Sequence, residues 1–190
     1  LAASPALAQS ATVSVYYAGP GGRVRTALTL APEFALVDDP AKADVLVLDG
    51  QIPDAERLAA LVAGGSGLVL VLGPETTAAQ LGALLGVPVT LAPQSEALSL
   101  APAEDTADGV IQDVVWTSAP QVRERSALEG SGLQPLVTGF EDGSMVLGRQ
   151  RLGDGQLYLF TSWLDDVNPQ FQDWAYFNYL IYDLVTRSDG

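Results

Sequence analysis

Four residues that could bind a ligand lie directly after predicted buried β-strands. Gln51 follows one apolar run, Glu75 and Thr76 follow a second, and Trp163 follows a third. In open α/β sheets, ligands bind at the edge formed by the carboxyl ends of the strands. The spacing therefore predicts that Gln51, Glu75, Thr76 and Trp163 bind a small sugar or an anion. Helix capping and turn formation explain the same residues without a ligand.

A glycine-rich turn after the first predicted strand is a second candidate. Residues 19–22 read Gly-Pro-Gly-Gly and lead directly into Arg23. Because the N-terminus of a helix attracts negative charge, Gly21, Gly22 and Arg23 are candidates for holding an anion. The turn has neither the G-x-G-x-x-G spacing of dinucleotide-binding proteins nor a P-loop. A tight connection between a strand and a helix is the competing interpretation.

The absence of cysteine and histidine restricts the chemistry of this chain. It excludes Ser-His-Asp triads, Cys-His pairs, histidine acid-base catalysis and the usual zinc sites from these residues. Acidic pairs at 38–39, 104–105 and 165–166 lack the spacing of an EF-hand, so we expect solvated turns there. The chain is predicted to bind no metal and no cofactor and not to be an enzyme. Hydrolysis by the carboxylates of Glu75 and Asp165 is the remaining catalytic alternative.

The net charge of the chain limits the classes of molecule that it is expected to bind. Lys and Arg together number 9 and Asp and Glu number 23, which gives a net charge of −14. A protein this acidic repels the phosphates of nucleic acids and anionic lipid head groups. We therefore expect no nucleic-acid partner.

The first ten residues resemble the end of a secretory signal peptide. Ala6-Leu7-Ala8 before Gln9 has the small-x-small pattern of a cleavage site. We interpret residues 1–10 as a signal-peptide remnant or a disordered N-terminus. This predicts an exported protein, periplasmic or extracellular, that a neighbouring protein or an anchor outside the chain holds at a membrane. No apolar run reaches the length of a membrane span, so no transmembrane segment is expected within the chain.

Short apolar runs alternate with stretches of helical periodicity along most of the chain. Five consecutive apolar residues at 68–72 lie between glycines, which is typical of a strand that is covered on both faces. An Asp-Gly turn at 142–143 predicts a hairpin. The predicted strands are residues 12–17, 33–37, 44–48, 68–72, 136–140, 145–151 and 156–160, and the predicted helices are residues 23–30, 53–63, 76–85 and 169–186.

This order of elements predicts one α/β domain over residues 11–187, followed by a tail at 188–190. We expect three layers, with a mostly parallel central sheet flanked by helices, as in flavodoxin-like and amidotransferase-like folds, and a hairpin at one edge. The less regular stretch at 87–129 is interpreted as an excursion over the edge of the sheet.

The helix predicted at 169–186 is rich in aromatic residues. Seven residues recur at three- and four-residue spacing and are predicted to face the sheet: Phe171, Trp174, Phe177, Asn178, Ile181, Leu184 and Val185. Tyr176, Tyr179 and Tyr182 lie elsewhere on the helix. Because tyrosine is favoured at protein interfaces, we interpret these three as a candidate contact surface for a protein partner.

Three stretches carry a resemblance to a known family. The family is the class I glutamine amidotransferase-like domains. Their early strand is similar to residues 43–49 (ADVLVLD), and their passage from a helix through a glycine turn into the central strand is similar to residues 61–73 (LVAGGSGLVLVLG). Their last strand and closing helix are similar to residues 153–161 (GDGQLYLFT) and 177–180 (FNYL). Among these, the chain most resembles extracytoplasmic members related to trehalose-utilisation proteins.

That resemblance implies the fold and argues against amidotransfer. Catalytic members carry a Cys after the central strand and a His-x-Glu after a late strand. This chain has Gly73-Pro74-Glu75 at the first position and Ser162-Trp163-Leu164 at the second. The family resemblance therefore describes a domain that has lost the catalytic residues.

The leading functional hypothesis from the sequence is a non-catalytic, exported interaction or scaffolding domain, such as an accessory subunit of a membrane-associated or cell-surface assembly. It rests on the signal-like start, the missing catalytic residues and the tyrosines of the last helix. The alternative is a module that binds a small sugar or an anion at the strand ends. A carboxylate-dependent hydrolase is the third hypothesis.

Overall fold

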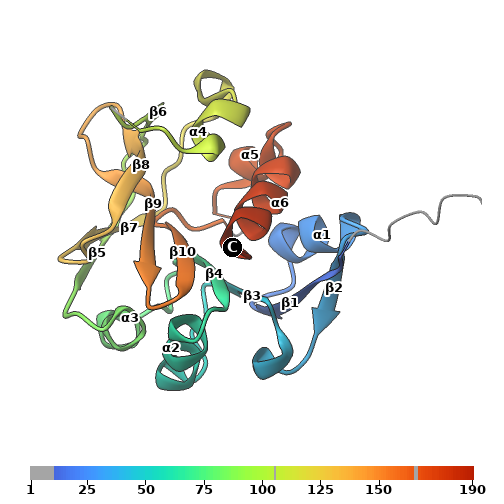
Figure 1. Cartoon of the computed structure of the whole chain (residues 1–190). Coiled ribbons are helices and arrows are strands. Elements are labelled where there is room, and N and C mark those ends of the chain that lie inside the picture. Colours follow the sequence, from blue (N-terminus) through green and yellow to red (C-terminus); the bar gives the residue numbers. More distant parts are fainter. Residues whose placement is uncertain (1–10, 105, 165–166) are drawn as a thin grey trace, which may run out of the picture.

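In the part of the chain that the structure describes, eight strands form the central sheet, in the order β2-β1-β3-β4-β10-β9-β8-β6 (Figure 1). The computed structural model describes residues 11–104, 106–164 and 167–190. The parallel part consists of β2 (Phe34–Val37), β1 (Val13–Ala18), β3 (Val45–Asp49), β4 (Gly67–Val71) and β10 (Gly155–Phe160). The antiparallel part continues with β9 (Met145–Leu152), β8 (Gln134–Gly139) and β6 (Leu100–Pro102). The predicted α/β fold with a mostly parallel sheet is confirmed.

The stretch at 87–129 adds strands that its sequence pattern does not predict. Its β6 pairs with β8 as the last strand of the sheet, so the predicted hairpin of β8 and β9 lies one strand inside the edge. In addition, β5 (Thr90–Gln94) and β7 (Arg125–Glu129) form a separate two-stranded sheet. Both β5 and β6 contain a proline, which strands tolerate at sheet edges but which conceals them in a sequence pattern.

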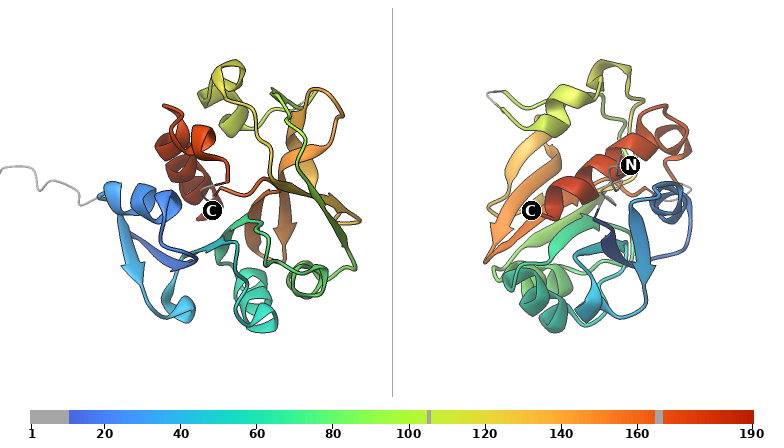
Figure 2. Two further views of the ribbon diagram at one scale, coloured as in Figure 1. Left: turned by 180° about the vertical axis from the view of Figure 1, so that it is seen from behind. Right: turned by 45° about the vertical axis from the view of Figure 1, so that its right-hand side comes forward.

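Helices cover both faces of the sheet (Figures 1 and 2). One face carries α1 (Arg23–Leu30), α5 (Pro169–Gln172) and α6 (Phe177–Ser188), and the other carries α2 (Ala55–Ala63) and α3 (Ala78–Leu85). A short helix, α4 (Gly109–Asp113), and two 3-10 turns, Pro40–Lys42 and Trp116–Ser118, complete the elements described.

The sequence of β3 and β4 explains this layering. Successive side chains of a strand point to opposite faces. The valines of the two strands (Val45, Val47, Val69 and Val71) accordingly pack on the α1 and α6 side, and their leucines (Leu46, Leu48, Leu68 and Leu70) pack on the α2 and α3 side. All eight side chains are fully buried, so both faces need a cover of helices.

The C-terminal helix differs from its prediction because it is interrupted. Residues 173–176 separate α5 from α6, and the turn brings the Trp174 ring to 5.6 Å from Trp116 and 5.5 Å from Phe171. Asn178, which was predicted to face the sheet, is exposed. At its other end, α6 extends to Ser188, whose hydroxyl donates to the Val185 carbonyl (2.9 Å), so the helix includes the first residue of the predicted tail.

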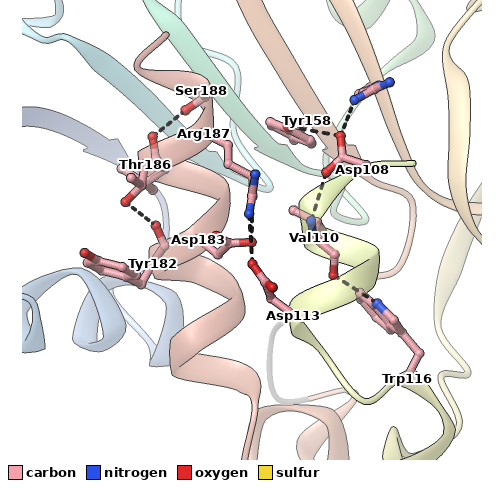
Figure 3. Close-up of polar contacts among 12 residues, drawn as sticks. Asp108, Val110, Asp113, Trp116, Tyr158, Tyr182, Asp183, Thr186, Arg187 and Ser188 are labelled. Atoms are coloured by element: carbon pink, nitrogen blue, oxygen red, sulfur yellow. Dashed lines mark hydrogen bonds and ion pairs between the residues drawn. The ribbon is translucent and has the colours of Figure 1, made fainter. Parts of the chain in front are cut away.

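Polar contacts tie the irregular α4 region to the sheet and to α6 (Figure 3). The buried carboxylate of Asp108 accepts hydrogen bonds from the Val110 amide (2.9 Å) and from the Arg149 guanidinium of β9. The Arg187 guanidinium of α6 donates to the carboxylate of Asp113, the last residue of α4 (2.9 Å). Because α4 has few residues, these charged contacts rather than helix propensity fix its position.

The buried face of α6 generates a stability prediction. Phe177 is 1% exposed, whereas Tyr179 on the same helix is 42% exposed. We expect Phe177→Ala to lower the free energy of unfolding by about 3–5 kcal/mol and Tyr179→Ala by about 0.5 kcal/mol, measured by urea denaturation. Equal losses for the two variants would show that this face of α6 is not the one that packs on the sheet.

Candidate ligand-binding site

A pocket of about 210 Å³ opens at the carboxyl ends of the parallel strands. The strand that follows β1 in the chain, β2, lies on one side of β1, and β3 and β4 lie on its other side. The strand order therefore reverses between β1 and β3. Ligands of open α/β sheets bind at such a reversal. The pocket is lined by Pro20 after β1, by Asp49, Gly50 and Gln51 at the end of β3, by Leu72, Gly73, Pro74 and Glu75 after β4, and by Trp163 and Leu164 after β10.

The turns after β3 and β4 approach each other at two glycines. Gly50 has a φ of +75°, and a Cβ on Gly73 would lie 2.9 Å from the Gly50 Cα. The Thr76 hydroxyl joins the two turns, since it accepts from the Gly73 amide (3.1 Å) and donates to the Gly50 carbonyl (3.2 Å). Thr76 is buried and does not line the pocket. Its role is therefore to hold the pocket wall in place.

The contact between Tyr17 and Asp49 beside this pocket was not predicted from the sequence. Asp49 is 5% exposed and lines the pocket, and its carboxylate accepts a hydrogen bond from the Tyr17 hydroxyl (3.2 Å). That hydroxyl accepts in turn from the Gly21 amide (3.1 Å). Burial and then the charge of Asp49 raise the pKa of Tyr17 above its ordinary value, so Tyr17 stays protonated and donates. The available signal was an aspartate that ends an otherwise apolar strand.

Three of the predicted binding residues do meet in this pocket. Gln51, Glu75 and Trp163 come from turns after three different strands. The indole N–H of Trp163 donates to the Ser126 hydroxyl (3.1 Å), which fixes the orientation of the ring. Gln51 and Glu75 are exposed, so their polar groups are accessible to a ligand.

The glycine-rich turn does not join them. Gly21 donates to Tyr17, Gly22 precedes α1 and accepts from the Thr26 amide (3.1 Å), and neither lines the pocket. Arg23 forms an exposed ion pair with Asp173 (2.7 Å). Its charge is thus paired with Asp173, which directly follows α5, and Pro20 is the residue of this turn that lines the pocket.

The three tyrosines predicted as an interface lie in different surroundings. Tyr176 is half-buried, packs on the core and lies 5.4 Å from the Trp174 ring. Tyr179 is exposed, and Tyr182 stacks on Phe34 of β2 with a ring separation of 5.4 Å. Tyr179 and Tyr182 share a groove, whereas Tyr176 contributes to packing.

Some predicted features lie outside the described residues. These are the signal-like segment at 1–10, the acidic residue Asp105, and the pair Asp165 and Asp166, which includes the proposed catalytic partner of Glu75. In the described part of the chain, no group of three Asp, Glu, His or Cys side chains is placed to hold a metal ion. The helices described there include none that is long and apolar enough to cross a membrane.

Comparison with known proteins identifies the fold. No protein-family profile and no curated protein sequence matches the chain. Among solved structures, the cytoplasmic protein STM1381 from Salmonella typhimurium LT2 has a TM-score of 0.73 at 13% identity, covering 93% of this chain and 99% of that one. A putative ThuA-like protein from Parabacteroides merdae ATCC 43184 has a TM-score of 0.60 at 12% identity, covering 95% and 90%.

The same fold also occurs as part of longer enzymes. A cold-adapted β-galactosidase from Rahnella sp. R3 has a TM-score of 0.57 at 18% identity, over 94% of this chain but only 31% of the enzyme. At these identities the likeness shows the fold alone. The chain is thus an α/β protein with a pocket at its strand ends, and its fold is similar to that of a ThuA-like protein.

The contact between Tyr17 and Asp49 generates a prediction on pH. Because the pKa of Tyr17 is raised on folding, its contribution to stability is complete below pH 10 and is lost as the pH rises further. Tyr17→Phe leaves the buried Asp49 without this donor and should cost about 1–3 kcal/mol at neutral pH. We also expect the free energy of unfolding to fall less steeply above pH 10 in the variant.

Urea denaturation at several pH values measures both effects, with Tyr16→Phe as the matched control on the same strand. A Tyr17→Phe variant that is as stable as the wild type, with the same alkaline slope, would contradict the described contact.

Proposed function

We propose that this chain is a non-catalytic binding domain that takes a small, neutral, hydroxyl-bearing ligand, such as a sugar, in the strand-end pocket. The observation that carries this proposal is the meeting of Gln51, Glu75, Trp163 and Asp49 around one cavity. Carboxylates accept hydrogen bonds from hydroxyl groups, an amide both donates and accepts, and an aromatic ring offers a flat apolar surface. Together these groups suit a ring that carries several hydroxyls.

The charges of the pocket disfavour an anion. Asp49 and Glu75 line it, and no Lys or Arg is among its described lining residues. The candidate cation, Arg23, is paired with Asp173. An anionic ligand would therefore meet repulsion without compensation, whereas hydroxyl or ammonium groups would find acceptors.

The size of the pocket limits the ligand further. A volume of about 210 Å³ is below the range of about 300–1,000 Å³ that is usual for drug-sized ligands. We infer that one sugar ring, rather than a dinucleotide or a long oligosaccharide, fits the enclosed part.

We further propose that the domain is a relative of the class I glutamine amidotransferase-like proteins without their catalysis. The fold likeness to a ThuA-like protein supports this relation. The turn where catalytic members carry their thiol is Gly73-Pro74-Glu75 here, and the chain has no Cys or His to replace the missing groups. The pocket occupies that turn, which is consistent with a site that has kept binding and lost chemistry.

A ligand panel in a thermal-shift assay tests the proposal. Neutral monosaccharides, ammonium compounds, phosphate and carboxylates are compared at equal concentration. We expect stabilisation by a neutral sugar, reaching about 2.7 kcal/mol when its concentration is 100 times the Kd. Glu75→Gln and Gln51→Ala should remove the effect, while Gln112→Ala, at an exposed glutamine of α4, should retain it.

Two results would contradict the proposal. Stabilisation by phosphate that Gln51→Ala abolishes would show that the strand-end pocket binds an anion. Release of product from a glycoside, abolished by Glu75→Gln, would instead establish the carboxylate-dependent hydrolase.

A further inference from the structure

An apolar groove of about 280 Å³ lies at the C-terminal end of α1, whereas the glycine-rich turn lies at its N-terminal end. The end of α1, the turn that follows it and one face of α6 form its walls, with Ala27, Leu30, Ala31, Pro32, Glu33, Asn178, Tyr179 and Tyr182 as lining residues. Leu30 is 63% exposed and Tyr179 42%, so two large side chains of one groove are open to solvent. The groove can therefore receive apolar side chains of a binding partner.

The groove adjoins a strand with a free edge. In the described part of the chain, β2 pairs only with β1. The Val13 amide donates to the Glu33 carbonyl (2.8 Å), and in the register that pairs Val15 with Leu36 this directs the backbone N–H and C=O of Leu36 outward. The four residues of β2 (FALV) include neither the lysine nor the proline with which exposed edges are commonly protected.

Groove and edge form one continuous surface. Phe34 of β2 stacks on Tyr182 at 5.4 Å with an interplanar angle of 23°. Leu36, two residues further along, points to the same face and is 37% exposed. Figures 1 and 2 show α1 beside β2 at this end of the sheet. A strand added to β2 would place its alternate side chains next to Phe34 and Leu36 and towards the groove.

The charges around this surface indicate which kind of segment would bind to it. Glu33 lines the groove at one end of β2, Asp38 is exposed at the other end, and the chain as a whole carries −14. Two copies that paired β2 antiparallel, with the outward-facing Leu36 of one copy opposite that of the other, would set Glu33 opposite the other copy's Asp39. Like charges directly opposite are destabilising, so a second copy is a poor occupant. A basic segment finds complementary charge at both ends.

We propose that β2 accepts an extended basic segment of a partner protein as an added strand, with alternate apolar side chains in the groove between α1 and α6. Backbone hydrogen bonds to the free edge supply affinity, and the groove supplies specificity. This interaction uses none of the residues of the strand-end pocket, so it stands independently of the proposed ligand.

The test is fluorescence anisotropy of the full chain with a short labelled peptide that alternates leucine and threonine and carries lysine at both ends. We expect this peptide to bind, the same peptide with glutamate for lysine to bind about tenfold more weakly or not at all, and N-methylation of its alternate amides to cost about tenfold. Leu30→Asn should also weaken binding about tenfold, as expected for an anchor. Phe140→Asn is the matched control, because Phe140 is 79% exposed and lies beyond β8.

Other outcomes would overturn the proposal. Binding that is unaffected by Leu30→Asn or by N-methylation would exclude strand addition at this groove. A chain that sediments as a dimer and becomes monomeric on Leu30→Asn would make a second copy the occupant. Gln51→Ala, which should abolish ligand binding in the pocket, should leave peptide binding unchanged, so failure of one proposal is distinguishable from failure of the other.

Discussion

The burial of β3 and β4 on both faces is the constraint on which the rest of the structure depends. Their valines and leucines alternate, so each strand contributes apolar surface to two separate clusters. Burying one such side chain contributes about 1.5–3 kcal/mol, and helices must cover both sides of the sheet for that gain to be realised. Polar groups can then appear on these strands only where they end, which places Asp49 and the turns around Gly50 and Gly73 at one edge.

That edge combines a rigid backbone with accessible polar groups. Gly50 and Gly73 let the two turns approach closely, and the Thr76 hydroxyl joins them. Asp49 accepts a hydrogen bond from the Tyr17 hydroxyl, while Gln51 and Glu75 remain exposed. A site whose walls are fixed before the ligand arrives loses less entropy on binding. The same architecture leaves β2 at the far edge of the sheet, so the pocket and the free edge at which we propose strand addition arise from one arrangement of strands.

The elements predicted best are those whose burial or turn type follows from a short stretch of sequence. The continuous apolar runs of β3 and β4 differ from their predicted bounds by one residue, and the Asp-Gly turn at 142–143 correctly indicated the hairpin of β8 and β9. Gln51, Glu75 and Trp163 meet because strand ends converge, which follows from topology. The ion pair of Arg23 with Asp173, 150 residues away, and the break before α6 depend on tertiary contacts that no local pattern carries. The contact of Tyr17 with Asp49 was missed for the same reason.

The central claim is that the strand-end pocket binds a neutral, hydroxyl-bearing ligand, and the indole N–H resonances of the protein test it most directly. The chain has 3 tryptophans, and Trp163 alone lines the pocket. In a ¹H–¹⁵N spectrum assigned with Trp163→Phe, titration with a neutral sugar should move the Trp163 signal and leave those of Trp116 and Trp174 in place. A Trp163 signal that does not respond to any neutral sugar, or that responds to phosphate instead, would contradict the account.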